Sequence, residues 1–298
     1  MRKSLVFLTL LALLAGAVAA VAQQTTTQPN ANAMTSPPKV LYVIREEVRP
    51  GKTIVHNQHE AAWTQALLKA DYKTHMLVIT SETGPAEDWF LIGFNSYADL
   101  EKDNNNLQKN AAWRNIMQEF SAKENDYVSD ARTVTARYQP QLSYQPDFKL
   151  GEFKYFSVGV LRMKMGHDLG DIEKILDAAR KKANLDTHIV CYEVNSGMPV
   201  GTYIFFSPLK SLAKWDEPPN AAYSQALKEA NFMSLAEKDV ASYELRLFSF
   251  NPQISHVSEA VAAADPAFWH PKPEMAKGEA VKKTTPTAKK ETKPEKKP

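Results

Sequence analysis

Two patterns of hydrophobic residues follow each other along the chain, one typical of a strand and one typical of a helix. Residues 40–48 are rich in β-branched side chains, which is typical of a strand. Residues 54–70 instead place Ala62, Trp63, Ala66, Leu67 and Ala70 on one stripe of a helix. Further strands are expected at 74–80, 88–94 and 127–143, and a second helix at 97–120 with an interruption at 103–106. The predicted order is therefore β-α-β-β-α-β.

The second part of the chain repeats this order. Strands are expected at 153–165, 187–194, 200–206 and 241–255, and helices at 171–183 and 209–237, the latter broken near Pro218-Pro219. The two middle strands are separated only by "NSGMP", a turn-forming stretch that predicts a hairpin.

Four sequence echoes link the two parts. "LYVIREEVRPGK" at 41 matches "FSVGVLRMKMGH" at 156, and "THMLVITSETGP" at 74 matches "THIVCYEVNSGMP" at 187. "AAW" at 111 matches "AAY" at 221, and "PQLS" at 140 matches "PQIS" at 252. The offsets of 115, 113, 110 and 112 residues are nearly constant. They predict a duplicated unit of about 110 residues, a normal size for a small domain.

The element order is that of the ferredoxin-like split β-α-β arrangement, an α+β fold. Such a unit has helices on one face of its sheet, so the other face must be covered. The duplicated pattern resembles the dimeric α/β-barrel superfamily over about residues 40–255. The resemblance implies two tandem ferredoxin-like units packed sheet to sheet as an intramolecular α/β barrel. It rests on order and duplication, so it implies no particular chemistry.

The two ends of the chain differ from the body. A basic start, an apolar stretch and "AVA" before residue 23 predict an export signal, the alternative being an uncleaved anchor. We expect a signal peptide at 1–22, a polar linker at 23–38, units at 39–145 and 150–257, and an extension at 258–298 with a disordered Lys/Pro-rich tail from 276. No transmembrane segment is expected in the mature chain, which should be periplasmic or secreted.

The net charge of +2 is the sum of an acidic central part, residues 23–275, and two basic ends. The tail carries eight Lys and three Glu, hence +5, and the first 22 residues carry +2, which leaves −5 for residues 23–275. A body of this charge argues against nucleic-acid binding. The tail is predicted either to solubilise the chain or to contact an anionic surface. Cys191, the single cysteine, sits in an apolar run and is expected in the core.

The main candidate site starts at "HNQHEAAW". His56, His59 and Trp63 share one helix face, where the second unit has Asp171 and Lys174. The alternative is that both histidines are partly exposed residues of the first turn. His75 should lie beyond the far end of this helix, about 24 Å away. Two histidines without a third ligand make a weak metal site, so no metal is expected.

Aromatic residues of the first unit suggest a binding cavity. Trp89 and Phe90 are neighbours in a strand and must point to opposite faces of the sheet. A small apolar or aromatic ligand would suit a cavity between sheet and helices. The predicted ligand-binding residues are His56, His59, Trp63, Trp89, Tyr97 and Trp113. Five carboxylates are expected only as strand-edge and turn charges: Glu46, Glu47, Glu82, Glu87 and Asp88.

No cofactor is expected, although the resemblance raises haem as an alternative. Chlorite dismutases and dye-decolorising peroxidases of this superfamily bind haem through a histidine of the C-terminal unit. Here His167, His188 and His256 lie in a loop or at strand ends, and none sits on a helix face. Haem-degrading monooxygenases resemble a single unit, and His59 with Trp63 could imitate their site.

Three functions therefore remain open. The first is an exported, soluble small-molecule-binding protein without a catalytic signature, since phosphate-binding glycine loops, nucleophile elbows and zinc-protease motifs are all missing from the sequence. The second is a monooxygenase-like or haem-binding enzyme. The third is a structural or interaction protein that uses the basic tail. The chain is expected to be a monomeric pseudo-dimer or to pair again as a homodimer.

Overall fold

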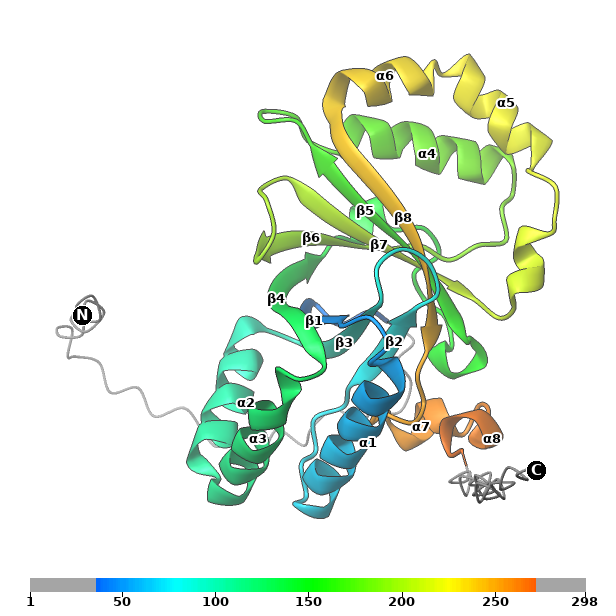
Figure 1. Ribbon diagram of the computed structural model, residues 1–298. Coiled ribbons are helices and arrows are strands. Elements are labelled where there is room, and N and C mark those ends of the chain that lie inside the picture. The colour runs from blue at the N-terminus through cyan, green and yellow to red at the C-terminus, as the bar shows by residue number, and fades with distance from the viewer. Residues whose placement is uncertain (1–35, 272–298) are drawn as a thin grey trace, which may run out of the picture.

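The computed structural model describes residues 36–271, in which eight strands form one closed antiparallel barrel (Figure 1). The strand order around the barrel is β1-β3-β2-β8-β5-β7-β6-β4. The strands are β1 (Val40–Val48), β2 (Leu77–Ser81), β3 (Glu87–Phe94), β4 (Val128–Tyr138), β5 (Tyr155–Met163), β6 (Val190–Ser196), β7 (Thr202–Leu209) and β8 (Val240–Phe250).

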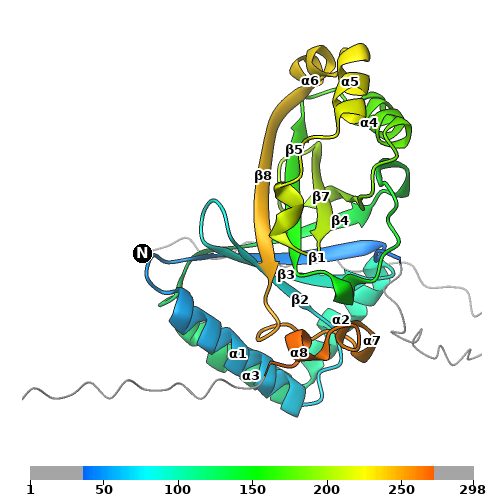
Figure 2. The same cartoon turned by 90° about the vertical axis from the view of Figure 1, so that its right-hand side faces the viewer.

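Helices cover the outside of the barrel in two groups. The first group is α1 (Thr53–Lys69), α2 (Tyr97–Lys109) and α3 (Ala111–Glu124), and the second is α4 (Gly170–Lys182), α5 (Ala221–Glu229) and α6 (Phe232–Asp239). Figures 1 and 2 show the groups at opposite ends of the molecule. Two short helices, α7 (Glu259–Ala262) and α8 (Pro266–Trp269), follow the last strand, and 3-10 turns lie at Pro140–Leu142, Leu150–Glu152 and Leu212–Trp215.

Each half of the chain contributes four neighbouring strands in the same relative order. The first half gives β4-β1-β3-β2 and the second half gives β8-β5-β7-β6. The halves join where β2 pairs with β8 and where β4 pairs with β6. The predicted barrel within a single chain is therefore present.

The glycines of the repeated hairpins lie where the two halves meet. Gly84, in the turn between β2 and β3, has φ +79°, and its α-carbon faces the Arg246 side chain of β8. Gly197, between β6 and β7, has φ +91°, and a Cβ there would lie 2.0 Å from the carbonyl oxygen of Thr133 in β4. Each hairpin tip therefore crosses onto the last strand of the other half, and at Gly197 the backbone of β4 leaves no room for a Cβ.

Alternating residues of the strands fill the barrel with apolar side chains. Trp89 points inward and packs on Phe248, with ring centroids 5.1 Å apart. Phe90 points outward, toward the helices, as the alternation predicts. Trp269 of α8 joins the interior core and donates from Nε1 to the carbonyl oxygen of Gly151. The first residues after the second predicted unit therefore help to close one end of the barrel.

Several predicted boundaries were wrong for identifiable reasons. The helix expected at 97–120 does not break at 103–106 but at Asn110, whose extended backbone ends α2 and whose side chain caps α3. The strand expected at 127–143 ends at Tyr138, because a 3-10 turn begins at Pro140. Within 209–237, Leu209 still belongs to β7, and regular helix begins only at Ala221.

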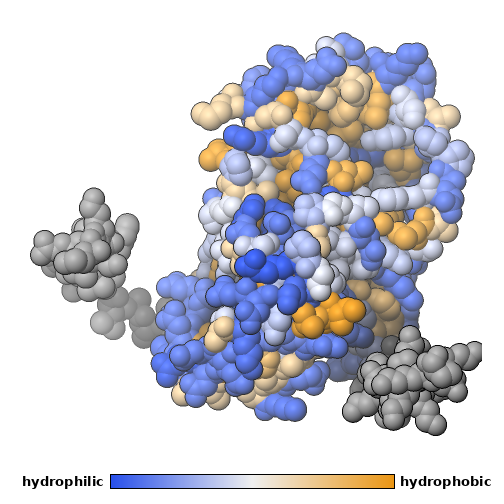
Figure 3. Space-filling view, viewed as in Figure 1, coloured by the Kyte–Doolittle hydropathy of each residue, from blue (hydrophilic) through white to orange (hydrophobic). Residues whose placement is uncertain are grey.

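The surface over the two halves differs. On the face in Figure 3, hydrophilic side chains predominate over the first helix group, whereas apolar side chains gather between the helices of the second. Tyr243 and Leu245 of β8 remain 57% and 54% exposed.

Cys191 is buried in the second half, and burial raises the pKa of its thiol well above the usual value. This agrees with the predicted core role.

Among residues 36–271, no helix has both the length and the apolar character needed to cross a bilayer. The predicted signal peptide, most of the predicted linker at 23–38 and the predicted disordered tail from 276 lie outside the described residues.

Candidate functional site

A cluster of charged side chains is buried between α1 and the four barrel strands of the first half, β4-β1-β3-β2, which we call the first-half sheet. Glu46 of β1 and Asp88 of β3 flank the imidazole of His56, which is fully buried. Nε2 of His56 lies 3.1 Å from Oε2 of Glu46. Nδ1 lies 3.1 Å from Oδ2 of Asp88, although its N–H does not point straight at that oxygen. Burial lowers the pKa of His56, but its close contacts with the carboxylates of Asp88 and Glu46 outweigh burial and raise the pKa to about 10.

Two further carboxylates extend this cluster. Glu60, one helical turn after His56, is 5% exposed, and burial together with Glu46 raises its pKa to about 8. Glu124 at the end of α3 has its pKa raised to about 7, by burial and by its interaction with Glu46. The cluster thus holds more carboxylates than one imidazolium can neutralise, so protons are retained.

The expectation that Glu46, Glu87 and Asp88 are edge charges was wrong. All three are at least nine-tenths buried. Glu87 faces the barrel interior, where its carboxylate accepts hydrogen bonds from Arg45, Arg246 and Nε1 of Trp89. Although burial raises the pKa of Glu87, these partners outweigh it and hold the pKa below its usual value. Glu87 therefore belongs to a structural ion cluster on the other side of the sheet.

In the second half, the strand positions that match Glu46 and Asp88 carry uncharged residues. Leu161 is the seventh residue of β5, as Glu46 is of β1, and its cross-strand partner is Tyr203, where Glu46 faces Asp88. On the helix, Glu173 is the fourth residue of α4, as His56 is of α1, and Glu173 is buried and paired with Arg180. The fold therefore does not require charge at the strand positions of Glu46 and Asp88.

A cavity of about 160 Å³ opens on the acidic side of the cluster. Glu46, Glu60 and Glu124 line one part of it, together with His59. The remaining walls are mainly apolar and aromatic: Ile44, Trp63, Phe90, Met117 and Phe120, with Ser121 and Ala131. None of the described residues that line this cavity is Lys or Arg. Its polar part consequently attracts cations or hydrogen-bond donors.

A second cavity of about 170 Å³ continues along the same helix–sheet layer. Ile44, Trp63 and Met117 line both cavities, so these side chains stand between them. At its other end, Asp103 accepts hydrogen bonds from the hydroxyls of Tyr72 and Thr74. We call the two adjoining cavities the helix–sheet pocket.

The structure brings together three of the six predicted site residues. His59 and Trp63 line the helix–sheet pocket, and His56 lies directly behind Glu46 and Glu60. His59 is held by the carbonyl oxygen of Phe120, 3.1 Å from Nε2, and by the rings of Phe120 and Tyr127. Burial lowers the pKa of His59.

The other three predicted residues lie elsewhere. Trp89 points into the barrel, on the opposite face of the sheet. The hydroxyl of Tyr97 donates to Asn195, across the join between the halves. Nε1 of Trp113 donates to the carbonyl oxygen of Ala70 and lies outside the pocket lining. His75 packs against His256, away from His56, as the helix length predicts.

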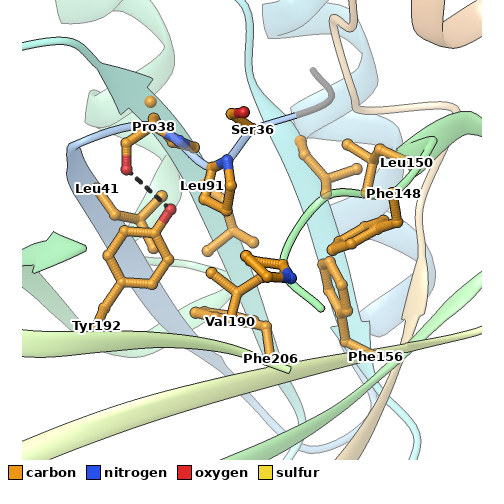
Figure 4. Close-up of a pocket in the computed structure, with 14 residues that line it drawn as sticks. Ser36, Pro38, Leu41, Leu91, Phe148, Leu150, Phe156, Val190, Tyr192 and Phe206 are labelled. Carbon is orange, nitrogen blue, oxygen red and sulfur yellow. Dashed lines mark hydrogen bonds between the residues drawn. The ribbon is translucent and has the colours of Figure 1, made fainter. Parts of the chain in front are cut away.

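A third cavity, of about 90 Å³, opens at the mouth of the barrel (Figure 4). Leu91, Phe148, Phe156 and other apolar side chains form its walls. The hydroxyl of Tyr192 is already used, because it donates to the carbonyl oxygen of Pro38. This cavity therefore offers shape and apolar surface but little chemistry.

In the helix–sheet pocket, Nε2 of His59 lies 3.1 Å from the carbonyl oxygen of Phe120, so this nitrogen is not free to bind a haem iron. In the second half, His167 is paired with Asp239. His188 borders an open surface groove lined by lysines and glutamates.

No protein-family profile matches the sequence. A search of curated proteins also finds no match. Similar solved structures include a proposed monooxygenase from Fusobacterium nucleatum, at 14% identity and a TM-score of 0.47, covering 73% of this chain and 94% of that one. A mutant chlorite dismutase from Candidatus Nitrospira defluvii has 9% identity and a TM-score of 0.47, covering 79% and 99% of the two chains. An anthrone oxidase-like protein has 14% identity and a TM-score of 0.47, covering 72% and 92%. At these values the likenesses carry no argument about this chain.

Proposed function

We propose that this protein binds a small molecule in the helix–sheet pocket. The ligand would have an apolar or aromatic body and one polar head group. The observation that carries the proposal is the combination, in one layer, of two adjoining apolar cavities and a buried cluster of carboxylates at one end. Binding sites are commonly apolar clefts with a few fixed polar groups.

The body of the ligand would lie along Trp63. This side chain borders both cavities and packs edge-on against Phe90, with ring centroids 6.2 Å apart. An aromatic ligand gains from offset or edge-to-face contact with such rings. The head group would face His59 and Glu60, which line the cavity together with Trp63 and Phe120.

We also propose the superfamily of the fold and the export of the chain. The two halves are interpreted as tandem ferredoxin-like units of the dimeric α/β-barrel superfamily, which is supported by their equal element order and strand order. Export is supported by the N-terminal sequence pattern alone. An exported binding protein would meet its ligand outside the cytoplasm.

A monooxygenase-like activity is the second candidate, but no observation in this chain favours it over binding alone. The names of similar structures, a proposed monooxygenase, an anthrone oxidase-like protein and a chlorite dismutase, describe those proteins alone. The proposal therefore rests on the cavities and side chains of this protein.

The test is a screen of small aromatic fragments by ligand-observed saturation-transfer NMR. Wild type is compared with Trp63→Ala, Trp63→Phe and the control Trp215→Ala, which alters a 51%-exposed tryptophan of the second half. Fragments should bind wild type and the control alike, lose binding to Trp63→Ala and partly retain it with Trp63→Phe. Equal binding to folded Trp63→Ala, or no binding to wild type, would contradict the proposal.

A further inference from the structure

Three side chains with metal-binding atoms converge at the acidic end of the helix–sheet pocket. A carboxylate oxygen of Glu46, a ring nitrogen of His56 and a carboxylate oxygen of Glu60 all lie within 4.8 Å of one another. Nε2 of His56 is 3.1 Å from Glu46 and 4.0 Å from Glu60. One imidazole and two carboxylates form a mixed nitrogen and oxygen donor set, which suits first-row divalent ions.

Glu60 is the side chain that points most clearly to a cation. Only 5% of it is exposed, and it lines the cavity beside His59. Within residues 36–271, the basic groups that approach it are ring nitrogens of His56 and His59, both at 4.0 Å, and no hydrogen bond between side chains reaches it. Buried carboxylates are normally hydrogen-bonded, paired or bound to a metal. The Glu60 carboxylate is therefore available to a cation that enters from the pocket.

The other side of His56 is arranged as in a metal-binding histidine. Nδ1 faces Asp88 at 3.1 Å, while Nε2 faces Glu46 and Glu60. The other oxygen of Asp88 accepts a hydrogen bond from the hydroxyl of Thr80, which fixes the carboxylate. A carboxylate behind the imidazole commonly orients a metal-bound histidine and raises its basicity.

The second half of the chain provides an internal comparison. There Leu161 and Tyr203, which belong to one apolar cluster, stand at the places of Glu46 and Asp88, and the buried Glu173 of α4 is paired with Arg180. Replacing a buried ion cluster by apolar residues is often neutral or stabilising. The two strand carboxylates of the first half, Glu46 and Asp88, are thus unnecessary for the fold and call for a different explanation.

We propose that Glu46, His56 and Glu60 bind a divalent first-row transition metal ion, with Asp88 orienting His56. The two carboxylates neutralise the charge of the ion. The inference deepens the proposed function and rests on it in one respect: the head group of the pocket ligand would be a donor that binds the metal. Binding of the ion itself does not depend on that ligand.

The test uses the full chain, stripped with a chelator, and Mn²⁺ as the probe. Electron paramagnetic resonance measures the free ion during titration of wild type, Glu60→Gln, Asp88→Asn and the control Glu119→Gln, an exposed residue of α3. Wild type and control should bind one ion per chain. Glu60→Gln should lose saturable binding, and Asp88→Asn should weaken it by roughly 10- to 100-fold. Circular dichroism verifies that each variant is folded.

Absence of saturable Mn²⁺ binding to wild type would overturn the inference. Equal affinities of folded Glu60→Gln and Glu119→Gln would overturn it as well, because the ion would then bind elsewhere. Fragment binding to the metal-free chain is measured separately. Fragments that bind without Mn²⁺ binding would leave the pocket in place and show that its acidic end takes an ammonium or hydrogen-bond donor instead.

Discussion

Glu46 lies directly opposite Asp88 in the register of β1 and β3, so two buried carboxylates of neighbouring strands point to the same face of the sheet. Like charges in this position normally destabilise a sheet. The imidazole of His56 stands between them, with one ring nitrogen 3.1 Å from each. The arrangement therefore depends on a protonated histidine or, with a metal, on the ion.

The first prediction concerns His56 in the metal-free protein. Although burial lowers its pKa, the contacts with Asp88 and Glu46 raise it to about 10. The imidazole nitrogens of His56 should therefore both stay protonated in NMR spectra from pH 6 to pH 8, and the ring should deprotonate only near pH 10. The signals of His59, whose pKa burial lowers, should titrate below the usual value. Titration of His56 near 6.5 would contradict the assigned contacts.

The second prediction concerns Glu60→Gln, again without metal. Because the folded-state pKa is raised from 4.5 to about 8, the wild type loses stability as pH rises through this window. The variant has no such charge. Its free energy of unfolding relative to that of wild type should therefore rise by about 2 kcal/mol between pH 5 and pH 7. Urea unfolding at both pH values measures the difference. A stability difference that is independent of pH would show that Glu60 is not desolvated.

The third prediction concerns Glu87→Gln on the inner face of the barrel. Loss of this charge leaves Arg45 and Arg246 without their shared partner, which should cost about 3 kcal/mol at pH 7. Since the pKa of Glu87 is lowered, its contribution is present above the unfolded value of 4.5 and is lost as pH falls through the folded value. The difference in free energy of unfolding between the variant and wild type should therefore become smaller in acid. Glu152→Gln, which breaks an exposed pair with Lys210, serves as the control and should leave the unfolding midpoint unchanged.

The fourth prediction compares two glycines of the repeat. Gly166→Ala introduces a Cβ at φ +83° with nothing within 4 Å, so it should cost roughly 1–2 kcal/mol. Gly197→Ala adds a collision with the Thr133 carbonyl and should cost at least about twice as much. Equal losses in thermal unfolding would mean that the hairpin tip does not press on β4.

The barrel could be predicted because its signals are local and repeated. Strand alternation placed Trp89 and Phe90 on opposite faces, and the spacing of Gly84 and Gly197 marked equivalent hairpins. The break at Asn110 was missed because three consecutive asparagines upstream gave a stronger breaking signal than the single residue that caps α3. In the structure, residues 103–106 stay helical within α2, and the helix breaks at Asn110.

The site was harder to predict because its buried face is polar. The predicted stripe on α1 followed alanines, and Ala62 is exposed, whereas His56, Glu60 and Thr64 are buried. Hydrophobic periodicity cannot identify an inward face made of charged residues. Glu46 and Asp88 likewise resembled strand-end charges. One signal was present: alternation along β1 puts Glu46 on the same face as Ile44 and Tyr42, which points toward the helices.

The most direct test of the account is a crystallographic soak of the full chain with small aromatic fragments. The account predicts fragment density between α1, α3 and the first-half sheet, against Trp63 and with a polar group toward Glu60. Density confined to the apolar barrel mouth beside Leu91 and Phe156, with the helix–sheet pocket empty at saturating fragment, would contradict it.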